Sequence, residues 1–454
     1  MKRVFLILAL LGCLPSYLTA APATGKYNVL FFAVDDLRPE FGAYGKSYIK
    51  SPNLDRLAAS GITFNHAYCQ QAVCSPSRSS LLTGTRPDTT KVWDLVTHFR
   101  KAIPDVVTLP QHFKNNGYFV QGMGKLFHGG FDDPVSWSVP WTSPKTSHGT
   151  YGLPENNAMV GRKAGKENVK KAKREDEARG PAFESSEVPD NTFHDGALAD
   201  NAIAALREIA KKDQPFWLGV GFIRPHLPFV SPKKYWDMYD PATIKLAPNP
   251  FAPKGAPPYA VTSFGELRSY AGIPATGPVP DDLARQLKHG YYAAISYMDA
   301  QMGRVVAELE RLGLREKTII VLWGDHGWKL GEHGSWCKHS NVENDTNAPL
   351  LISVPGLKTA GQHSDALVEF VDIYPTLAEL TGLPLPAHLE GKSFVPVLQD
   401  PQRAWKTAAF SQYPRSSLMG YSMRTDRYRL TRWVSKNDHS KVDSVELYDH
   451  SVDP

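Results

Sequence analysis

The chain has 454 residues, and its 51 basic and 46 acidic side chains leave a net charge of +5. So mild a charge argues against nucleic-acid binding as the main function. The composition, 42% apolar and 21% charged, is that of a globular protein long enough for two domains. The 36 prolines and 35 glycines indicate many ordered loops.

Met1–Ala23 predicts a secretory signal peptide, with Lys2 and Arg3 before an apolar core and small residues at the cleavage site. Cleavage after Ala20 fits nearly as well. The apolar run is too short to span a bilayer, and no membrane span is expected later in the chain. We expect an exported protein, periplasmic or secreted. Lipid anchoring through Cys13, which follows Leu-Leu-Gly, is the alternative.

Apolar runs typical of buried strands alternate with helical patterns, which predicts an α/β sheet with helices on both faces. Most of these runs end at polar residues of the kinds that carry chemistry. The predicted strands are 29–34, before Asp35 and Asp36; 118–123, before Lys125 and His128; 216–222, before His226; 318–322, before Asp325 and His326; and 350–354.

Helical spacing predicts a long helix over 281–312, whose stripe from Ile295 to Leu309 is core packing, and a second helix over 371–380. The stretch 129–189 lacks periodicity and is interpreted as an insertion. We place a catalytic domain at 24–400 and a smaller antiparallel subdomain at 401–454, with strands near 408–413, 421–424 and 428–434. The abrupt end of the chain predicts that this subdomain is truncated.

Acidic residues follow two of the predicted strands. Asp35 and Asp36 are adjacent carboxylates, which is costly unless a cation or a shared proton compensates. In open α/β sheets, sites form beyond the carboxyl ends of the strands, so Asp325 is expected beside them. Oxygen ligands of this kind suit a hard divalent ion, most simply Ca²⁺. The plainer reading of Asp35 and Asp36 is an acidic turn.

The segment Cys74-Ser-Pro-Ser-Arg78, followed by Leu-Thr-Gly, resembles the maturation signature of the sulfatases. In that family the cysteine is oxidised to formylglycine, whose hydrate attacks sulfur and later expels sulfate. The plainer reading is a buried structural cysteine. Further stretches are similar to the iduronate-2-sulfatase group of the family: 28–39, 70–78, 86–90, 124–128, 224–229, 325–334, 338–341 and 411–415.

The resemblance implies a fold like that of alkaline phosphatase and a Ca²⁺ ion. The implied metal ligands are Asp35, Asp36, Asp325, His326 and the formylglycine at position 74. Arg78 would orient that group, His128 would hydrogen-bond its hydroxyl, and Lys125 would bind sulfate. His226 and Lys338 would contact sulfate or the leaving group, and Lys338 could also pair with a uronate carboxylate. A maturase that oxidises the cysteine, oxygen-dependent or anaerobic, is the implied partner.

The expected reaction is hydrolysis of a sulfate ester, favouring the 2-O-sulfate of iduronate in a glycosaminoglycan. Another sulfated polysaccharide, such as an algal one, is the closest alternative. A phosphomonoesterase or phosphonate hydrolase of the same superfamily, or a binding protein that keeps the fold, is a further one. Fold alone does not fix the substrate.

Three features stay open at this stage. Cys69 and Cys337 either form a disulfide near the pocket or remain two thiols. His333 either supports the site or is structural. The basic cluster at 162–179 is either a solvated segment or a docking surface for a polyanionic substrate.

Overall fold

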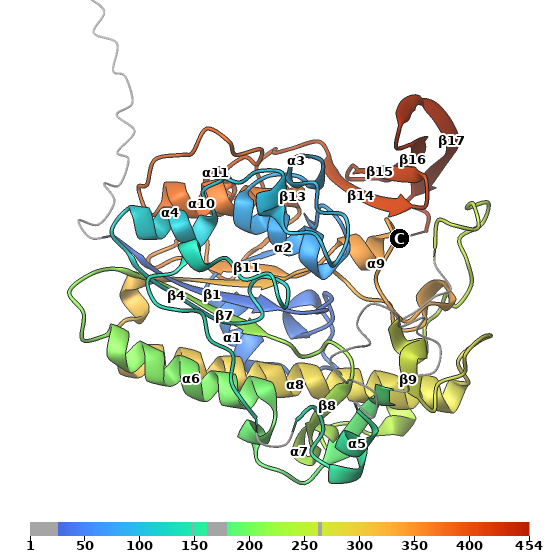
Figure 1. Cartoon of the computed structure of the whole chain (residues 1–454), viewed down its shortest axis with the longest axis horizontal. Helices are drawn as coiled ribbons and strands as arrows, with labels where there is room; N and C mark the ends of the chain where they lie inside the picture. The colour runs from blue at the N-terminus through green and yellow to red at the C-terminus, as the bar shows by residue number, and fades with distance from the viewer. Residues whose placement is uncertain (1–25, 147–148, 161–178, 262–265, 454) are drawn as a thin grey trace, which may run out of the picture.

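A seven-stranded mixed sheet forms the centre of the molecule, with the strand order β12-β2-β11-β10-β1-β7-β4 (Figure 1). Neighbours β4, β7, β1 and β10 are parallel, and β11 runs antiparallel to β10 and β2. The bounds are β1 (Asn28–Val34), β2 (Ile62–Phe64), β4 (Phe119–Gly124), β7 (Phe216–Phe222), β10 (Thr318–Gly324), β11 (Leu350–Ser353) and β12 (His363–Ser364).

This computed structural model describes residues 26–146, 149–160, 179–261 and 266–453. The predicted signal peptide, Cys13 and residues 162–178 of the basic cluster lie outside the described residues. Among the helices of the described ranges, none has the length and apolar character needed to cross a membrane.

Helices cover both faces of the sheet, as predicted (Figure 1). In β1, Leu30, Phe32 and Val34 pack into one core, whereas Val29, Phe31 and Ala33 pack into the other. Burial on both faces explains why this strand is a continuous apolar run. The first core also contains α1 (Pro52–Ala59), α6 (His194–Ile209) and α8 (Asp281–Arg311). The second contains α2 (Cys74–Thr83), α4 (Leu109–Asn115), α10 (Ile373–Leu380) and α11 (Val395–Gln399).

The long helix is confirmed as α8, which ends one residue before the predicted limit. Asp281 and Asp282 occupy its first turn, where the helix dipole favours acidic side chains. Ile295, Met302 and Leu309 are at most 1% exposed, so the apolar stripe is core.

The predicted insertion contains short elements that join other parts of the chain. Strand β5 (Arg179–Pro181) pairs with β9 (Tyr270–Ala271), and β6 (Phe183–Ser186) pairs with β8 (Phe229–Pro232). The remaining short elements are β3 (Ala67–Tyr68), β13 (Val368–Glu369), α3 (Pro87–Thr90), α5 (Pro154–Met159), α7 (Lys233–Trp236) and α9 (Glu343–Thr346).

The C-terminal residues form a four-stranded antiparallel sheet, which confirms the predicted smaller sheet (Figure 1). It contacts the rest of the molecule through a backbone hydrogen bond from Gln412 to Gln70 and an ion pair between Arg429 and Glu343. The boundary near residue 400 stays a prediction. The strands are β14 (Ala409–Arg415), β15 (Leu418–Arg424), β16 (Tyr428–Ser435) and β17 (Asp438–Asp449).

Candidate active site

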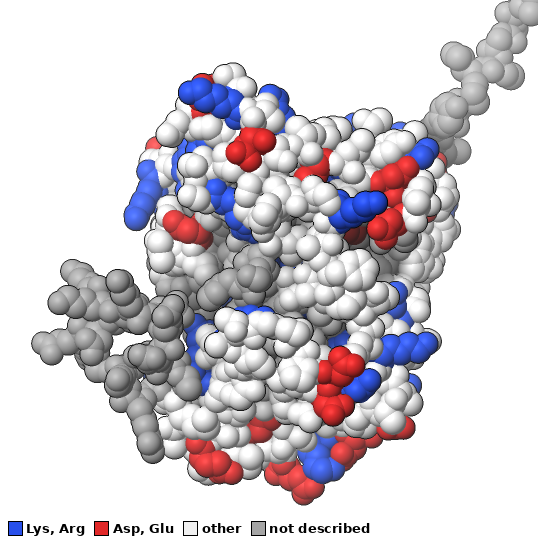
Figure 2. All heavy atoms as spheres, turned by 90° about the vertical axis from the view of Figure 1, so that its right-hand side faces the viewer, with Lys and Arg blue, Asp and Glu red and all other residues white. Residues whose placement is uncertain are grey.

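The polar residues that follow the four parallel strands meet at one edge of the sheet. The backbone amide of Asp36, after β1, donates to Asp325 Oδ1, after β10, at 3.1 Å. Lys125, after β4, forms an ion pair with Asp35, and His226 Nε2, after β7, lies 3.9 Å from the same carboxylate. The carboxyl ends of these strands point to the side of the molecule seen in Figure 2, where Lys and Arg side chains are interspersed with Asp and Glu.

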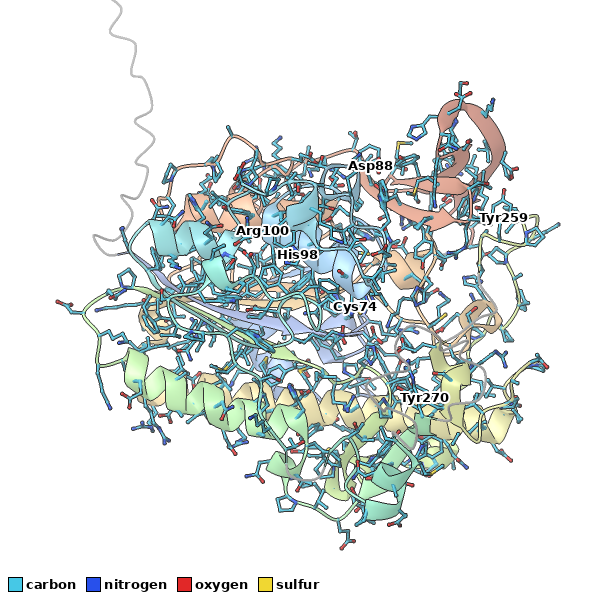
Figure 3. The ribbon with its side chains drawn as sticks, in the orientation of Figure 1. Cys74, Asp88, His98, Arg100, Tyr259 and Tyr270 are labelled. Carbon is cyan, nitrogen blue, oxygen red and sulfur yellow. The ribbon has the colours of Figure 1, made fainter. Side chains whose placement is uncertain are left out.

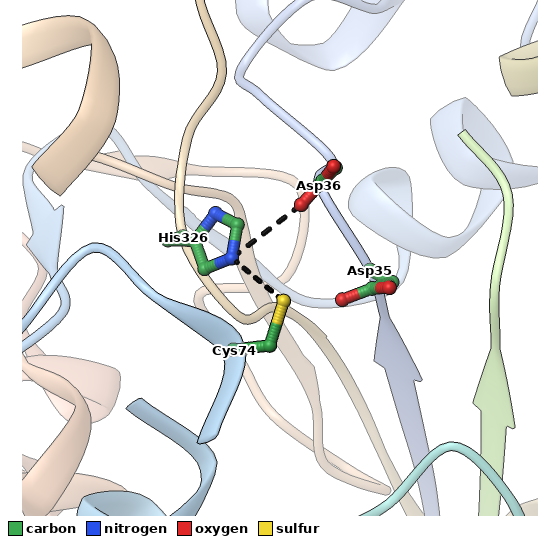
Figure 4. Close-up of side chains that lie close together, drawn as sticks. All are labelled: Asp35, Asp36, Cys74 and His326. Carbon is green, nitrogen blue, oxygen red and sulfur yellow. Dashed lines mark hydrogen bonds and ion pairs between the residues drawn. The ribbon is translucent and has the colours of Figure 1, made fainter. Parts of the chain in front are cut away.

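Helix α2 brings Cys74 to this edge, because Cys74 is its first residue and points at the strand ends (Figure 3). The Cys74 sulfur lies 3.3 Å from His326 Nε2, which in turn lies 3.4 Å from Asp36 Oδ1 (Figure 4). Asp35, Asp36, Cys74 and His326 are buried and each offers one ligand atom, all within 4.8 Å of one another. Sequence reasoning had placed these four residues together.

Arg78 stands one helical turn after Cys74 on the same face of α2 and is fully buried. Its Nε donates to Asp325 Oδ2 at 2.9 Å, and its Nη2 donates to Asp35 Oδ1 at 3.2 Å. Nη1 donates to the carbonyls of Lys125 and Leu126. One guanidinium therefore joins the ends of three strands, a use for which the fork of five donors is suited.

The two adjacent carboxylates have opposite pKa shifts. Burial raises the pKa of Asp35, but the charges of Lys125, His226 and Arg78 outweigh it and hold the pKa well below its usual range. Burial raises the pKa of Asp36 to about 7; Lys338 opposes this effect, and Asp35 adds to it. An additional positive charge at this position would favour the ionised form of Asp36.

Both predicted acid–base histidines lie at this edge and are neutral at neutral pH. Burial and Lys125 lower the pKa of His128 to about 4, and burial lowers the pKa of His226 to about 4 against the opposing charge of Glu266. No described group is within hydrogen-bonding reach of the buried His128 Nδ1. His226 Nδ1 lies 2.7 Å from the Leu227 carbonyl, which only accepts, so this nitrogen carries the proton.

Lys338 completes the positively charged groups predicted from the sequence. Its Nζ lies 2.9 Å from Asp36 Oδ1 and 4.8 Å from the centre of the Trp328 ring. The structure thus brings together every side chain that the sequence singled out for this site, on loops after β1, β4, β7 and β10 and on α2.

The profile of the family described as Sulfatase matches residues 27–383, and the profile described as N-sulphoglucosamine sulphohydrolase, C-terminal, matches 331–454. Iduronate 2-sulfatase from Homo sapiens is 35% identical over 96% of this chain and 91% of its own length. A sulfatase from Formosa agariphila is 32% identical over 94% of this chain and 82% of its own length.

This chain belongs to the sulfatase family. It is a sulfuric ester hydrolase of that family, and the resemblance seen in its motifs is confirmed.

Solved structures agree with this sulfatase in fold. A phosphonate monoester hydrolase from Silicibacter pomeroyi superposes with a TM-score of 0.73 at 23% identity, covering 94% of this chain and 90% of its own. A 2-O GAG sulfatase superposes with a TM-score of 0.66 at 20% identity, covering 95% and 86%. At these identities the likeness establishes the alkaline-phosphatase-like fold alone.

The donor set of this sulfatase fits a calcium ion. Asp35 and Asp36 supply the hard oxygens that Ca²⁺ prefers, and Asp325 Oδ1 lies 3.5 Å from His326 Nε2 at the rim of the same group. Burial is the main cause of the raised pKa of Asp36, and a dication held here would favour the ionised form of this carboxylate. Cys74 stands where its oxidised form would contribute an oxygen.

Sequence reasoning missed Glu266, which lies in the short helix Glu266–Ser269. Its Oε2 is 3.0 Å from Lys338 Nζ, and its Oε1 is 3.3 Å from His226 Nε2. Burial raises the pKa of Glu266, but the ammonium charge of Lys338 outweighs burial and holds the carboxylate ionised. No motif surrounds Glu266 in the sequence, and its contacts form only in the folded chain.

Two of the other open predictions resolve as structural, whereas the role of the basic cluster stays a prediction. Cys69 and Cys337 are buried thiols, and no disulfide bond joins them. Burial raises the pKa of both, to about 11 for Cys337, so neither is a thiolate at neutral pH. His333 contacts the Phe251 carbonyl at 3.3 Å, whereas its neighbour Glu332 pairs with Arg38, in the loop after β1, at 3.0 Å.

Proposed function

We propose that this sulfatase removes the 2-O-sulfate of iduronate in a glycosaminoglycan, using a formylglycine at position 74 and a bound Ca²⁺. The observation that carries the proposal is the position of Cys74. It starts a buried helix 3.3 Å from His326 and within the same group as Asp35 and Asp36. The substrate assignment rests on the 35% identity to iduronate 2-sulfatases over nearly the whole chain.

Asp35, Asp36, Asp325, His326 and the residue at position 74 would hold the cation, which would supply positive charge against the sulfate oxygens. A formylglycine at position 74 would supply a hydrated aldehyde, whose chemistry is nucleophilic attack on sulfur followed by release of sulfate. Arg78 fixes the start of α2 by its bonds to Asp35 and Asp325. This keeps residue 74 aimed at the strand ends.

Four side chains of this chain act on charge and protons. Lys125 and Lys338 neutralise the negative charge of the ester, which is otherwise a poor electrophile. His128, neutral because burial lowers its pKa to about 4, would accept a proton from a hydroxyl of the formylglycine hydrate at position 74. His226 lies across the site, where the anionic ester would favour protonation of its Nε2, which would then donate to the leaving oxygen. A uronate carboxylate would meet the ammonium group of Lys338.

Mass spectrometry of the peptide containing Cys74 tests the proposal first, on protein made with a maturase. The expected mass loss corresponds to conversion of the thiol to an aldehyde. Modified protein should then release sulfate from 2-O-sulfated iduronate disaccharides in preference to 6-O-sulfated glucosamine. Preference for an algal sulfated glycan or for bis-p-nitrophenyl phosphate would contradict the substrate. An unmodified thiol in fully active protein would contradict the nucleophile.

We also propose that the chain is exported, from its N-terminal signal pattern alone. Fractionation of the host cell, with detection in periplasm or medium, tests this. Retention of the protein in the cytoplasm would contradict it.

A further inference from the structure

A buried ion pair lies behind the reaction centre and has no part in the chemistry above. Lys329 stands in the loop after β10, and Asp345 lies on α9, at the side of the molecule to which the strand ends point (Figure 1). Both side chains are fully buried, and Lys329 Nζ donates to Asp345 Oδ1 at 2.5 Å and also to Oδ2. Removing two charges from water is costly, and apolar side chains of similar volume often give equal or greater stability. Stability alone therefore does not account for this pair.

The ion pair is tied to the main chain on both sides of Lys338. Asp345 Oδ2 accepts from Ser340 Oγ at 2.5 Å. The backbone amide of Lys329 donates to the Cys337 carbonyl at 3.1 Å, and Lys329 Nζ lies 3.5 Å from the Lys338 carbonyl oxygen. A lysine side chain is long and flexible, so the position of its ammonium depends on where its backbone is held. The pair therefore fixes the point from which the Lys338 side chain starts.

The main chain of Asp345 has a separate contact. The amide of Gly327, the residue after His326, donates to the Asp345 carbonyl at 2.8 Å. A Cβ on Gly327 would lie 2.0 Å from the Asn344 carbonyl oxygen, so α9 packs directly against this turn. A substitution of the Asp345 side chain leaves the carbonyl contact in place. Changes to the ion pair should thus act on the residues that flank Lys338 and spare the turn beside His326.

We propose that Lys329 and Asp345 are positioning residues, which hold the backbone of Lys338 where its ammonium meets a sulfate oxygen. The inference rests on the role proposed for Lys338 toward the ester and extends it to two buried residues. Lys338 Nζ lies 2.9 Å from Asp36 and 3.0 Å from Glu266, so both carboxylates compete with the anion for this ammonium. If the backbone moved, the ammonium would stay with the carboxylates and the anion would lose a partner.

The test uses formylglycine-bearing enzyme, with 4-nitrocatechol sulfate as substrate and inorganic sulfate as inhibitor. The double variant Lys329→Met/Asp345→Leu replaces the pair with apolar side chains and should unfold at a temperature near that of the wild type. We expect its inhibition constant for sulfate to rise about threefold to tenfold, with a parallel rise in KM and a smaller change in kcat. Lys338→Met removes the ammonium itself and should raise the inhibition constant at least as much.

Lys233→Met/Asp237→Leu is the matched control, because the same two residue types form an exposed pair at α7, with side chains 44% and 58% exposed. Its inhibition constant should equal that of the wild type. Ser340→Ala is the second variant, in case the double variant does not fold. It removes only the hydroxyl that donates to Asp345, and its inhibition constant should rise about twofold.

An inhibition constant and a KM equal to those of the wild type, in a stable double variant, would overturn the positioning role and leave the pair structural. The same result in Ser340→Ala would overturn it if the double variant does not fold. A lower kcat with unchanged sulfate inhibition would also overturn it, because the effect would not pass through Lys338. Unchanged inhibition in Lys338→Met would contradict the role proposed for Lys338 itself, and the positioning with it. Weaker inhibition in Lys338→Met alone would keep that role and reject only the positioning.

Discussion

Glu266 sets a negative charge between Lys338 and His226, two groups expected to meet an anionic substrate. Arg179, on β5, lies 3.9 Å from the same carboxylate. In this arrangement Glu266 competes with the substrate for the ammonium of Lys338. Glu266 also holds that ammonium in place. Its net effect on catalysis therefore depends on whether the competition or the positioning is the larger effect.

Glu266→Gln tests that balance. Removing the charge keeps the shape of the side chain and raises the positive potential of the site, so inorganic sulfate should inhibit about threefold to tenfold more strongly, and less so at high salt. Inhibition constants at two ionic strengths measure this. Glu379→Gln, at an exposed helix position, is the control. Weaker inhibition by sulfate would show that Glu266 mainly positions Lys338.

His128 predicts a pH dependence of stability. Its pKa is about 4 in the folded chain and ordinarily 6.5, so between these values the unfolded chain binds more protons. The stabilising contribution is complete above pH 6.5 and is lost as the pH falls towards 4.

Denaturant unfolding of wild type and His128→Gln at several pH values checks this. Relative to the variant, the wild type should lose on the order of 1 kcal/mol of unfolding free energy per pH unit below 6.5. His363→Gln is the exposed control. A difference between wild type and His128→Gln that stays constant with pH would contradict the burial of a neutral imidazole.

At the scale of elements, the site depends on how closely β4 and β7 approach. A Cβ on Gly221 would lie 2.2 Å from the backbone carbon of Lys125, so only glycine lets the chain leave β4 at this place. Gly221→Ala should cost about 1–3 kcal/mol of stability and displace Lys125. We expect the folded variant to have a reduced kcat, because Lys125 would no longer lie against the sulfate ester.

Thermal unfolding together with kcat measures the effect of Gly221→Ala. The matched control is Gly129→Ala, because a Cβ on Gly129 would meet nothing within 4 Å, although the residue adjoins His128. Equal behaviour of the two variants would show that the close approach of β4 and β7 does not matter for the site.

The elements differ in how far the sequence predicts them. Strands such as β1 are continuous apolar runs because both faces are buried, and the polar residues that follow them mark the sheet edge. Helix α2 has no such signal: all ten of its residues are buried, so no amphipathic period remains. The pairing of β6 with β8 joins short segments more than 40 residues apart, which no local pattern records.

Over the whole molecule, the sequence predicts the site best where a strand end or a motif fixes the residue. Asp35, Asp325 and Cys74 are of this kind, and they meet as expected. Glu266 lies on a segment without period or motif, and only the tertiary fold brings it to the site. The C-terminal sheet also contacts the segment that precedes Cys74, because the Ser411 hydroxyl donates to the Cys69 carbonyl.

Calcium binding should act on the stability of the whole chain. The donors come from β1, β10 and α2, which unfolding separates, so the ion binds the folded state and stabilises it by RT ln(1 + [Ca²⁺]/Kd), about 2.7 kcal/mol at a hundredfold excess over Kd. Thermal unfolding with added CaCl₂ and with EDTA measures this, and activity should fall in parallel on chelation. Asp36→Asn should remove the calcium-dependent shift in Tm, whereas Asp282→Asn, a substitution at a 95% exposed side chain, should keep it. A Tm that changes with neither added calcium nor EDTA would contradict calcium binding. It would show that Lys125, Lys338 and Arg78 alone balance the charge of the buried carboxylates.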